Sequence, residues 1–236
     1  MDKTRITAAL LLMCGLIGLG SFIKAGIDDY AQKDRCVSVK GLAERDVPAD
    51  KVVWPIQLKD AGNDLTGLYE NMSGKTQKVI AFLKKNGIPE SEIFVSATNV
   101  YDKQAERYVS ENAQLIRYQA SKVITVVSNN VDLVRRLLSS QEELLKQGVA
   151  IASGDSWEGM GPQYSFNGLN ELKPEMIEEA TKNASSVADK FASDSKSELG
   201  AICNANQGQF SITDRDSNTP YIKTIRVVTT IDYFLN

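Results

Sequence analysis

Histidine is absent from all 236 residues of the chain, and this absence removes more chemistry than any other feature of the composition. Without an imidazole, the chain cannot build a Ser-His-Asp or Cys-His catalytic set, an H-E-x-x-H metal site, or a histidine proton shuttle. An enzyme made from this sequence would depend on carboxylates, lysine, tyrosine or a bound cofactor. We therefore predict a protein that is not an enzyme and that carries neither a cofactor nor a metal.

Several other chemical signatures are absent or incomplete. Residues 73–76, SGKT, end like a phosphate-binding loop, but the glycine that this pattern requires at position 69 is replaced by Tyr69. Residues 214–218, DRDSN, resemble the start of a calcium loop, but Thr219 replaces its glycine and Ile225 its closing glutamate, so a polar hairpin turn explains them better. No C-x-x-C pair and no run of basic residues occurs, and the net charge is -3. We predict no nucleic-acid partner.

Acidic side chains cluster around Pro48, where Glu44, Asp46 and Asp50 follow one another closely. As an acid–base set they would need a pocket that shifts their pKa values, and nothing in the sequence indicates one. We interpret residues 36–58 as a β-hairpin whose turn exposes these carboxylates. Alternation then places four apolar residues on its buried side: Val37, Val39, Trp54 and Ile56.

The N-terminal segment, residues 1–25, contains an uncharged run from Ile6 to Ile23, preceded by Lys3 and Arg5. As a helix this run would span about 27 Å, close to the thickness of a bilayer core. We predict a transmembrane anchor; the alternative is a signal segment cleaved after Gly20. Because the basic residues precede the run, the rest of the chain is expected on the outer side of the membrane in both cases.

Three cysteines occur in the chain. Cys14 lies in the apolar run and is interpreted as a buried apolar thiol, since Met13 is a poor residue before a lipidated cysteine. An exported compartment permits disulfides, so one interpretation of the other two cysteines is a bridge between Cys36 and Cys203. The alternative is a pair of reduced, buried thiols.

The exported part is predicted to be an α+β domain over residues 36–236, reached by a polar linker at 26–35. Helices alternate with antiparallel hairpins, which favours two related α/β lobes of approximately 36–128 and 129–236. A first amphipathic helix follows Asn63 or Asp64 as its N-cap. Its predicted buried stripe is Leu65, Leu68, Met72, Val79, Phe82 and Leu83.

Four further expectations concern single elements. Pro55 cannot donate to a ladder, so its strand should lie at an edge or bulge there. The strands at 92–101 and 115–128 should form a hairpin with a long arm. The helix at 129–148 should point Val134, Leu137, Leu138, Leu144 and Leu145 inward. The helix at 173–200 should bury Met176, Ile177, Ala180, Ala184, Val187, Ala188 and Phe191, its alanines permitting close packing on a sheet.

The order of these signals resembles the SIMPL-domain family, also called DUF541, which includes bacterial periplasmic immunogenic proteins. The resemblance rests on Gly41, Ala43, Pro48 and Asp50, followed by NGIPESEI and by the alanine-rich third helix. It implies an exported, often oligomeric α+β domain of the bacterial envelope, of uncertain role and sometimes tied to envelope or oxidative stress. It supplies no catalytic residues. The implied location is a single pass of the inner membrane with the domain in the periplasm, or the periplasm itself after cleavage.

Function is accordingly predicted as a non-enzymatic assembly module, a homo-oligomer tethered through residues 6–23, with an unknown protein partner. The segment at 157–169 and the arm at 102–114 are the expected contact surfaces. The alternative is an enzyme or small-ligand binder that uses carboxylates or tyrosines in a cleft between the lobes.

Overall fold

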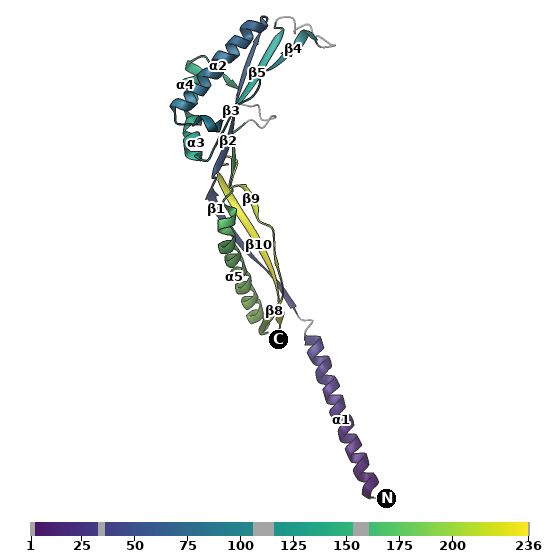
Figure 1. Ribbon diagram of the computed structural model, residues 1–236. Helices are drawn as coiled ribbons and strands as arrows, with labels where there is room; N and C mark the ends of the chain where they lie inside the picture. Colours follow the sequence, from purple (N-terminus) through teal and green to yellow (C-terminus); the bar gives the residue numbers. More distant parts are fainter. Residues whose placement is uncertain (1–2, 33–35, 106–115, 153–160, 236) are drawn as a thin grey trace. The chain divides into compact units, whose positions relative to one another are not determined.

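A computed structural model describes residues 3–32, 36–105, 116–152 and 161–235, with side chains of the first segment described over 11–27. The chain forms two compact units that interleave in sequence (Figure 1). Unit 1 contains residues 1–45, 170–212 and 225–236, and unit 2 contains residues 46–169 and 213–224. This division differs from lobes of 36–128 and 129–236, because the first and last long strands of the domain belong to one sheet.

The first helix, α1, extends from Lys3 to Gln32. It therefore continues through most of the segment expected to be a linker, since residues 27–32 contain neither proline nor glycine and extending a formed helix needs no new nucleus. Apolar side chains such as Leu11, Leu16 and Phe22 are exposed along it. Within the described residues, no helix combines the length and the hydropathy that a membrane span requires.

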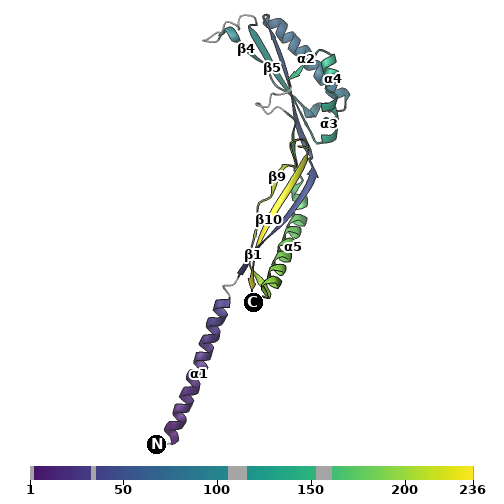
Figure 2. The same ribbon diagram turned by 180° about the vertical axis from the view of Figure 1, so that it is seen from behind.

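Unit 1 is built on a sheet with the strand order β1 (Cys36–Pro48), β10 (Ile222–Leu235) and β8 (Leu199–Gln207), while β9 (Ser211–Asp214) also pairs with β10. Strands β8 and β10 are antiparallel. Alternate residues of β1 and β10 are buried. The helix α5 (Leu169–Ser195) lies along this face in both views (Figures 1 and 2).

Helix α5 meets β1 at unusually close range. Its buried residues recur every fourth position and are Met176, Ala180, Ala184, Ala188 and Ala192. A Cβ atom built on Gly41 of β1 would lie 1.9 Å from the Ala180 carbonyl oxygen and 2.9 Å from the Ala184 Cβ. The predicted close packing of alanines on a sheet is confirmed. Val187 and Phe191 are exposed, so their predicted burial is wrong; the strict four-residue spacing turns the stripe away from them.

Unit 2 contains a second sheet, with the order β3 (Ile93–Val95), β5 (Tyr118–Ser128), β2 (Lys51–Gly62) and β6 (Ile151–Ala152). Two short strands complete it: β4 (Asn99–Asp102) beside β5, and β7 (Gln163–Ser165) beside β2. Three α-helices, α2 (Leu65–Lys85), α3 (Val131–Ser139) and α4 (Glu142–Lys146), cover one side of the sheet in both views (Figures 1 and 2). Two 3₁₀ turns, η1 (Glu90–Glu92) and η2 (Lys103–Ala105), lie in its connections.

Most local expectations in unit 2 are confirmed. Asp64 caps α2 by accepting the backbone N–H groups of Thr66 and Gly67. The predicted hairpin forms through β3 and β4, which both pair antiparallel with β5. Leu65 is exposed, however, because it occupies the first turn of α2, ahead of the residues that reach the core.

The helix expected at 129–148 divides into α3 and α4, which are separated at Ser140 and Gln141. Val134, Leu137 and Leu144 are buried and Leu138 is partly buried. Leu145 is exposed, because the break changes the direction of the chain and removes it from the buried stripe.

The predicted hairpin of residues 36–58 is wrong. β1 pairs with β10 and β2 pairs with β5, so the two strands belong to different sheets. Its four apolar residues are buried as expected, but Val37 and Val39 lie in the core of unit 1 whereas Trp54 and Ile56 lie in the core of unit 2. The connection between the strands is held instead by Ala49 N–H, which donates to Tyr221 O at 2.8 Å.

Pro55 lies inside the continuous β2–β5 ladder, opposite Thr125. On the other side of β2, β7 pairs with residues 51–53 and β6 with residues 57–58, so neither strand pairs with Pro55. Strand β2 is therefore central in the sheet, but at Pro55 it has a neighbouring strand on one side only. The missing N–H of the proline there removes no hydrogen bond from the sheet.

Candidate interaction site

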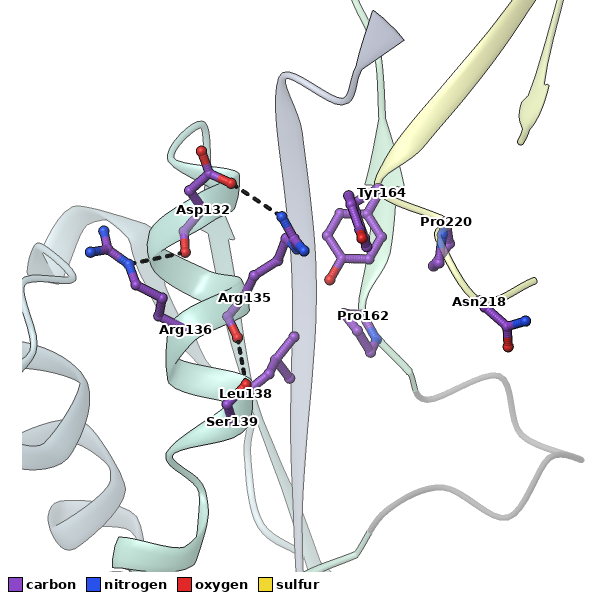
Figure 3. Close-up of a pocket in the computed structure, with 10 residues that line it drawn as sticks. Asp132, Arg135, Arg136, Leu138, Ser139, Pro162, Tyr164, Asn218 and Pro220 are labelled. Carbon is purple, nitrogen blue, oxygen red and sulfur yellow. Dashed lines mark hydrogen bonds and ion pairs between the residues drawn. The ribbon is translucent and has the colours of Figure 1, made fainter. Parts of the chain in front are cut away.

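A hollow of about 760 Å³ opens in unit 2 beside α3 (Figure 3). Helix α3 supplies one wall, and the segment from Pro162 to Tyr164 and the turn before β10 supply the others. Arginine, tyrosine and proline dominate its lining: Asp132, Arg135, Arg136, Leu138, Ser139, Pro162, Tyr164, Asn218, Pro220 and Tyr221. We call this hollow the Arg135 groove.

Arg135 is the centre of the groove. Its guanidinium carbon lies 3.4 Å from the centroid of the Tyr221 ring, and its Nη1 lies 3.3 Å from the Asp132 carboxylate. Positions i and i+3 share one face of a helix, so α3 itself aligns Asp132 with Arg135. Asn130 fixes the start of that helix by accepting the N–H of Leu133. A cation on an aromatic face results, oriented by its own carboxylate.

Tyr164 continues the aromatic surface. Its ring centroid lies 6.1 Å from that of Tyr221 at an interplanar angle of 72°, which is an edge-to-face pair. Burial raises the pKa of the Tyr164 phenol, so this group stays neutral at physiological pH. Figure 3 shows Tyr164 across the hollow from helix α3, which carries Arg135.

Arg136 gives the groove a second positive charge. Its Nε donates to the Asp132 backbone carbonyl at 3.4 Å. Among the residues that the structure describes, no carboxylate forms an ion pair with it. The Arg136 side chain is exposed.

A second hollow of about 700 Å³ adjoins the first and shares Asp132, Arg135 and Tyr221 with it. Glu92 lines this second hollow, and its Oε2 is buried without a hydrogen-bond partner in the described part of the chain. Arg135 and Tyr221 therefore line both hollows.

Two hydrogen-bonded turns support the groove. Asp50 accepts the N–H groups of Asn167 and Gly168 at 2.7 and 2.9 Å, which fixes the chain just after β7. Asp216 is bound by the Thr219 hydroxyl and by two backbone N–H groups of its own turn. The Thr219 hydrogen bond is the main reason that the pKa of Asp216 is lowered to about 2. This turn, which the sequence likened to a calcium loop, uses its carboxylate internally.

Within the described ranges, no aspartate or glutamate is a buried residue, and no group of three or more acidic or cysteine side chains is placed to hold a metal ion. Glu44 and Asp46, weighed as an acid–base pair with Asp50, are exposed. Asp46 accepts the Thr224 hydroxyl at 2.6 Å.

The other residues singled out in the sequence lie apart from the groove. Cys36 and Cys203 are exposed cysteines in unit 1 whose sulfurs are 3.1 Å apart. Residues 73–76 are helical, inside α2. Of the two expected contact surfaces, the first contributes Pro162 and Tyr164 to the groove, with residues 157–160 outside the described chain. Most of the second, residues 106–114, also lies outside it.

Sequence reasoning did not single out Arg135, Arg136 or Tyr221. Arg135 and Arg136 lie on the helix expected at 129–148, and Tyr221 lies just before β10. A signal was present in the adjacent arginines and in a tyrosine following Pro220, but only the fold brings these positions together.

A comparison with protein-family models matches residues 37–227 to SIMPL, described as a protein of unknown function (DUF541). The chain belongs to the SIMPL family. The match includes residues of both units and confirms the resemblance drawn from Gly41, Ala43, Pro48 and Asp50. No curated protein matches the chain.

Proposed function

We propose that this SIMPL protein is a non-enzymatic assembly module of the bacterial envelope, tethered to the membrane through residues 6–23, whose copies bind one another. The Arg135 groove is the observation that carries the proposal. Tyrosine and arginine are enriched at the energetic centres of protein interfaces, where they fill desolvated pockets. A role in envelope or oxidative stress is proposed on the family resemblance alone.

Charge complementarity supports the acidic part of helix α5 as the surface that binds the groove. The groove contains the positively charged Arg136 side chain and, beside it, the Arg135–Tyr221 stack. The first half of α5 exposes four glutamates: Glu171, Glu175, Glu178 and Glu179. Arg45 pairs with Glu175 at 2.7 Å and with Glu179 at 3.2 Å. In the described part of the chain Glu171 and Glu178 form no ion pair, so they are available to a second copy.

The proposed contact joins the acidic part of α5 in one copy to the Arg135 groove of the next. Such a head-to-tail interface uses two different surfaces, so it closes into a ring or continues as a filament. Bidentate arginine–carboxylate pairs provide its specificity, and the aromatic stack provides its apolar centre.

Assembly can be measured by sedimentation velocity on the full chain in detergent micelles. The wild-type protein is expected to form species larger than a monomer, and Arg136→Glu is expected to weaken association by about tenfold or more, because it places like charges opposite one another. Lys146→Glu is the matched control, since Lys146 is exposed on α4 and does not line the groove.

A charge exchange makes the test specific for the surface. Glu178→Arg alone should weaken association, and mixing this variant with Arg136→Glu should restore it. A wild-type protein that stays monomeric at high concentration would rule out assembly, and equal weakening by Lys146→Glu would rule out the groove as the interface.

Membrane attachment is a separate part of the proposal. It is supported by the uncharged run from Ile6 to Ile23 and the basic residues that precede it. We expect the full chain to remain in bacterial membranes after alkaline carbonate extraction and a variant with Leu12→Arg and Leu16→Arg to be released, because arginine at the centre of a span is costly. Release of the wild-type chain would exclude an uncleaved anchor.

A further inference from the structure

The sheet of unit 2 has a second face, turned away from its apolar core, and this face carries a polar hollow of about 240 Å³. Six polar side chains line it: Gln57, Lys59, Asn99, Tyr101, Gln119 and Ser121. Strand register places them together, because Lys59 lies opposite Ser121, Ser121 opposite Asn99, and Gln119 opposite Tyr101. Residues opposite each other in an antiparallel sheet share a face. We call this hollow the polar sheet site.

Gln57 is the most unusual residue of the site. It is only 7% exposed, yet its Oε1 has no hydrogen-bond donor among the described residues. A buried carbonyl oxygen without a donor destabilises the fold, and such groups in folded proteins are normally satisfied by water or a ligand. The terminal torsion of a glutamine is broad, so its amide can turn the oxygen toward the hollow at little cost. A donor from outside the chain would satisfy it.

Lys59 supplies the only formal charge in the lining. Its side chain is exposed, and the described residues provide no acidic partner for it. Three carboxamides and two hydroxyls also line the hollow, and each of these groups can donate and accept hydrogen bonds. The site therefore matches a ligand with one negative charge and several neighbouring hydroxyl groups.

The volume of the hollow restricts the size of the ligand. The hollow is smaller than the 300–1,000 Å³ typical of pockets for drug-sized molecules, so it admits a single ring. The half-exposed Tyr101 ring offers an apolar wall beside the hydrogen-bonding groups. A sugar ring presents this combination of carbon–hydrogen faces and hydroxyl edges.

We propose that the polar sheet site binds the uronic acid unit of a saccharide. The carboxylate pairs with Lys59 Nζ, and the ring hydroxyls bond to the carboxamides of Gln57, Asn99 and Gln119. This function is independent of the Arg135 groove, which shares no residue with the site.

Ligand-observed saturation-transfer NMR on the full chain in detergent tests the proposal with three probes at equal ionic strength. Glucuronate is expected to bind with a dissociation constant of about 1 mM, as suits a ligand of this size. Glucose, which lacks the charge, should bind about tenfold more weakly, and acetate, which lacks the hydroxyls, should show no saturable binding. Equal binding of glucuronate and acetate would overturn the proposal.

Three variants assign the binding to this face. Lys59→Met should abolish the preference for glucuronate over glucose, and Gln57→Leu, which keeps the buried volume, should weaken both sugars. Asn99→Asp, at an exposed position, should weaken glucuronate while sparing glucose. Lys122→Met is the control, because Lys122 lies opposite Leu58 on the other face of the sheet. Unchanged glucuronate binding in Lys59→Met and Asn99→Asp, or equal loss in Lys122→Met, would overturn the proposal.

Discussion

Replacing Gly41 with alanine is expected to lower the free energy of unfolding by about 3 kcal/mol and the melting temperature by about 10 °C. The new methyl group would overlap the Ala180 carbonyl oxygen and approach the Ala184 backbone nitrogen at 2.5 Å. Both atoms belong to the backbone of α5, so no side-chain rotation relieves the overlap. The helix must move away from β1, which opens the alanine-lined contact. Circular dichroism melting curves measure the effect.

Gly74→Ala is the matched control for this substitution. Gly74 lies inside α2, and a Cβ atom there would have nothing within 4 Å. Glycine in a helix interior is less favourable than alanine, so this variant should be stabilised by about 0.5–1 kcal/mol. If Gly41→Ala melts within 2 °C of the wild type, α5 does not depend on the close approach.

Oxidation of Cys36 and Cys203 to a disulfide is expected to stabilise the chain by about 4–5 kcal/mol. The sulfurs are 3.1 Å apart, so a small movement forms the bond, while 167 positions separate the residues in sequence. The bridge would join β1 to β8, the strands on either side of β10. Its stabilisation arises because the cross-link restricts the unfolded chain over a long loop.

The comparison uses the full chain before and after treatment with glutathione disulfide, which accepts the two electrons as the thiols lose their protons. Intact mass after alkylation counts free thiols, and denaturant unfolding gives the stability. The variant with Cys36→Ser and Cys203→Ser should match the reduced protein, whereas Cys14→Ser should behave as wild type. Alkylation of both Cys36 and Cys203 after oxidation would contradict the prediction.

The four residues that carry the family resemblance prove to have structural roles. Gly41 admits α5, Ala43 is buried on the same strand, and Pro48 ends β1. Asp50 fixes the turn after β7 through Asn167 and Gly168. The motif therefore identifies the fold through packing and turn contacts.

Periodicity in the sequence predicted the long helices and several strands of the described chain, because alternation and 3.6-residue spacing are local properties. The cap at Asp64, the strand predicted at 115–128 (observed as Tyr118–Ser128) and the alanine stripe of α5 all followed from short segments. The predictions of burial were wrong where the packing geometry determines exposure, as at Leu145, Val187 and Phe191. A residue at the border of a stripe is buried only if its neighbour extends far enough to cover it.

By itself, the sequence determined the absence of imidazole chemistry, the α+β class and the family. Only the tertiary structure decided that β1 and β2 enter different sheets, that Arg135 stacks on Tyr221, and that Gln57 is buried beside Lys59. The physical reason is the same in each case. Strand pairing and side-chain clusters join residues far apart in the chain, and several partners satisfy the same alternation equally well, so the choice depends on how whole surfaces pack.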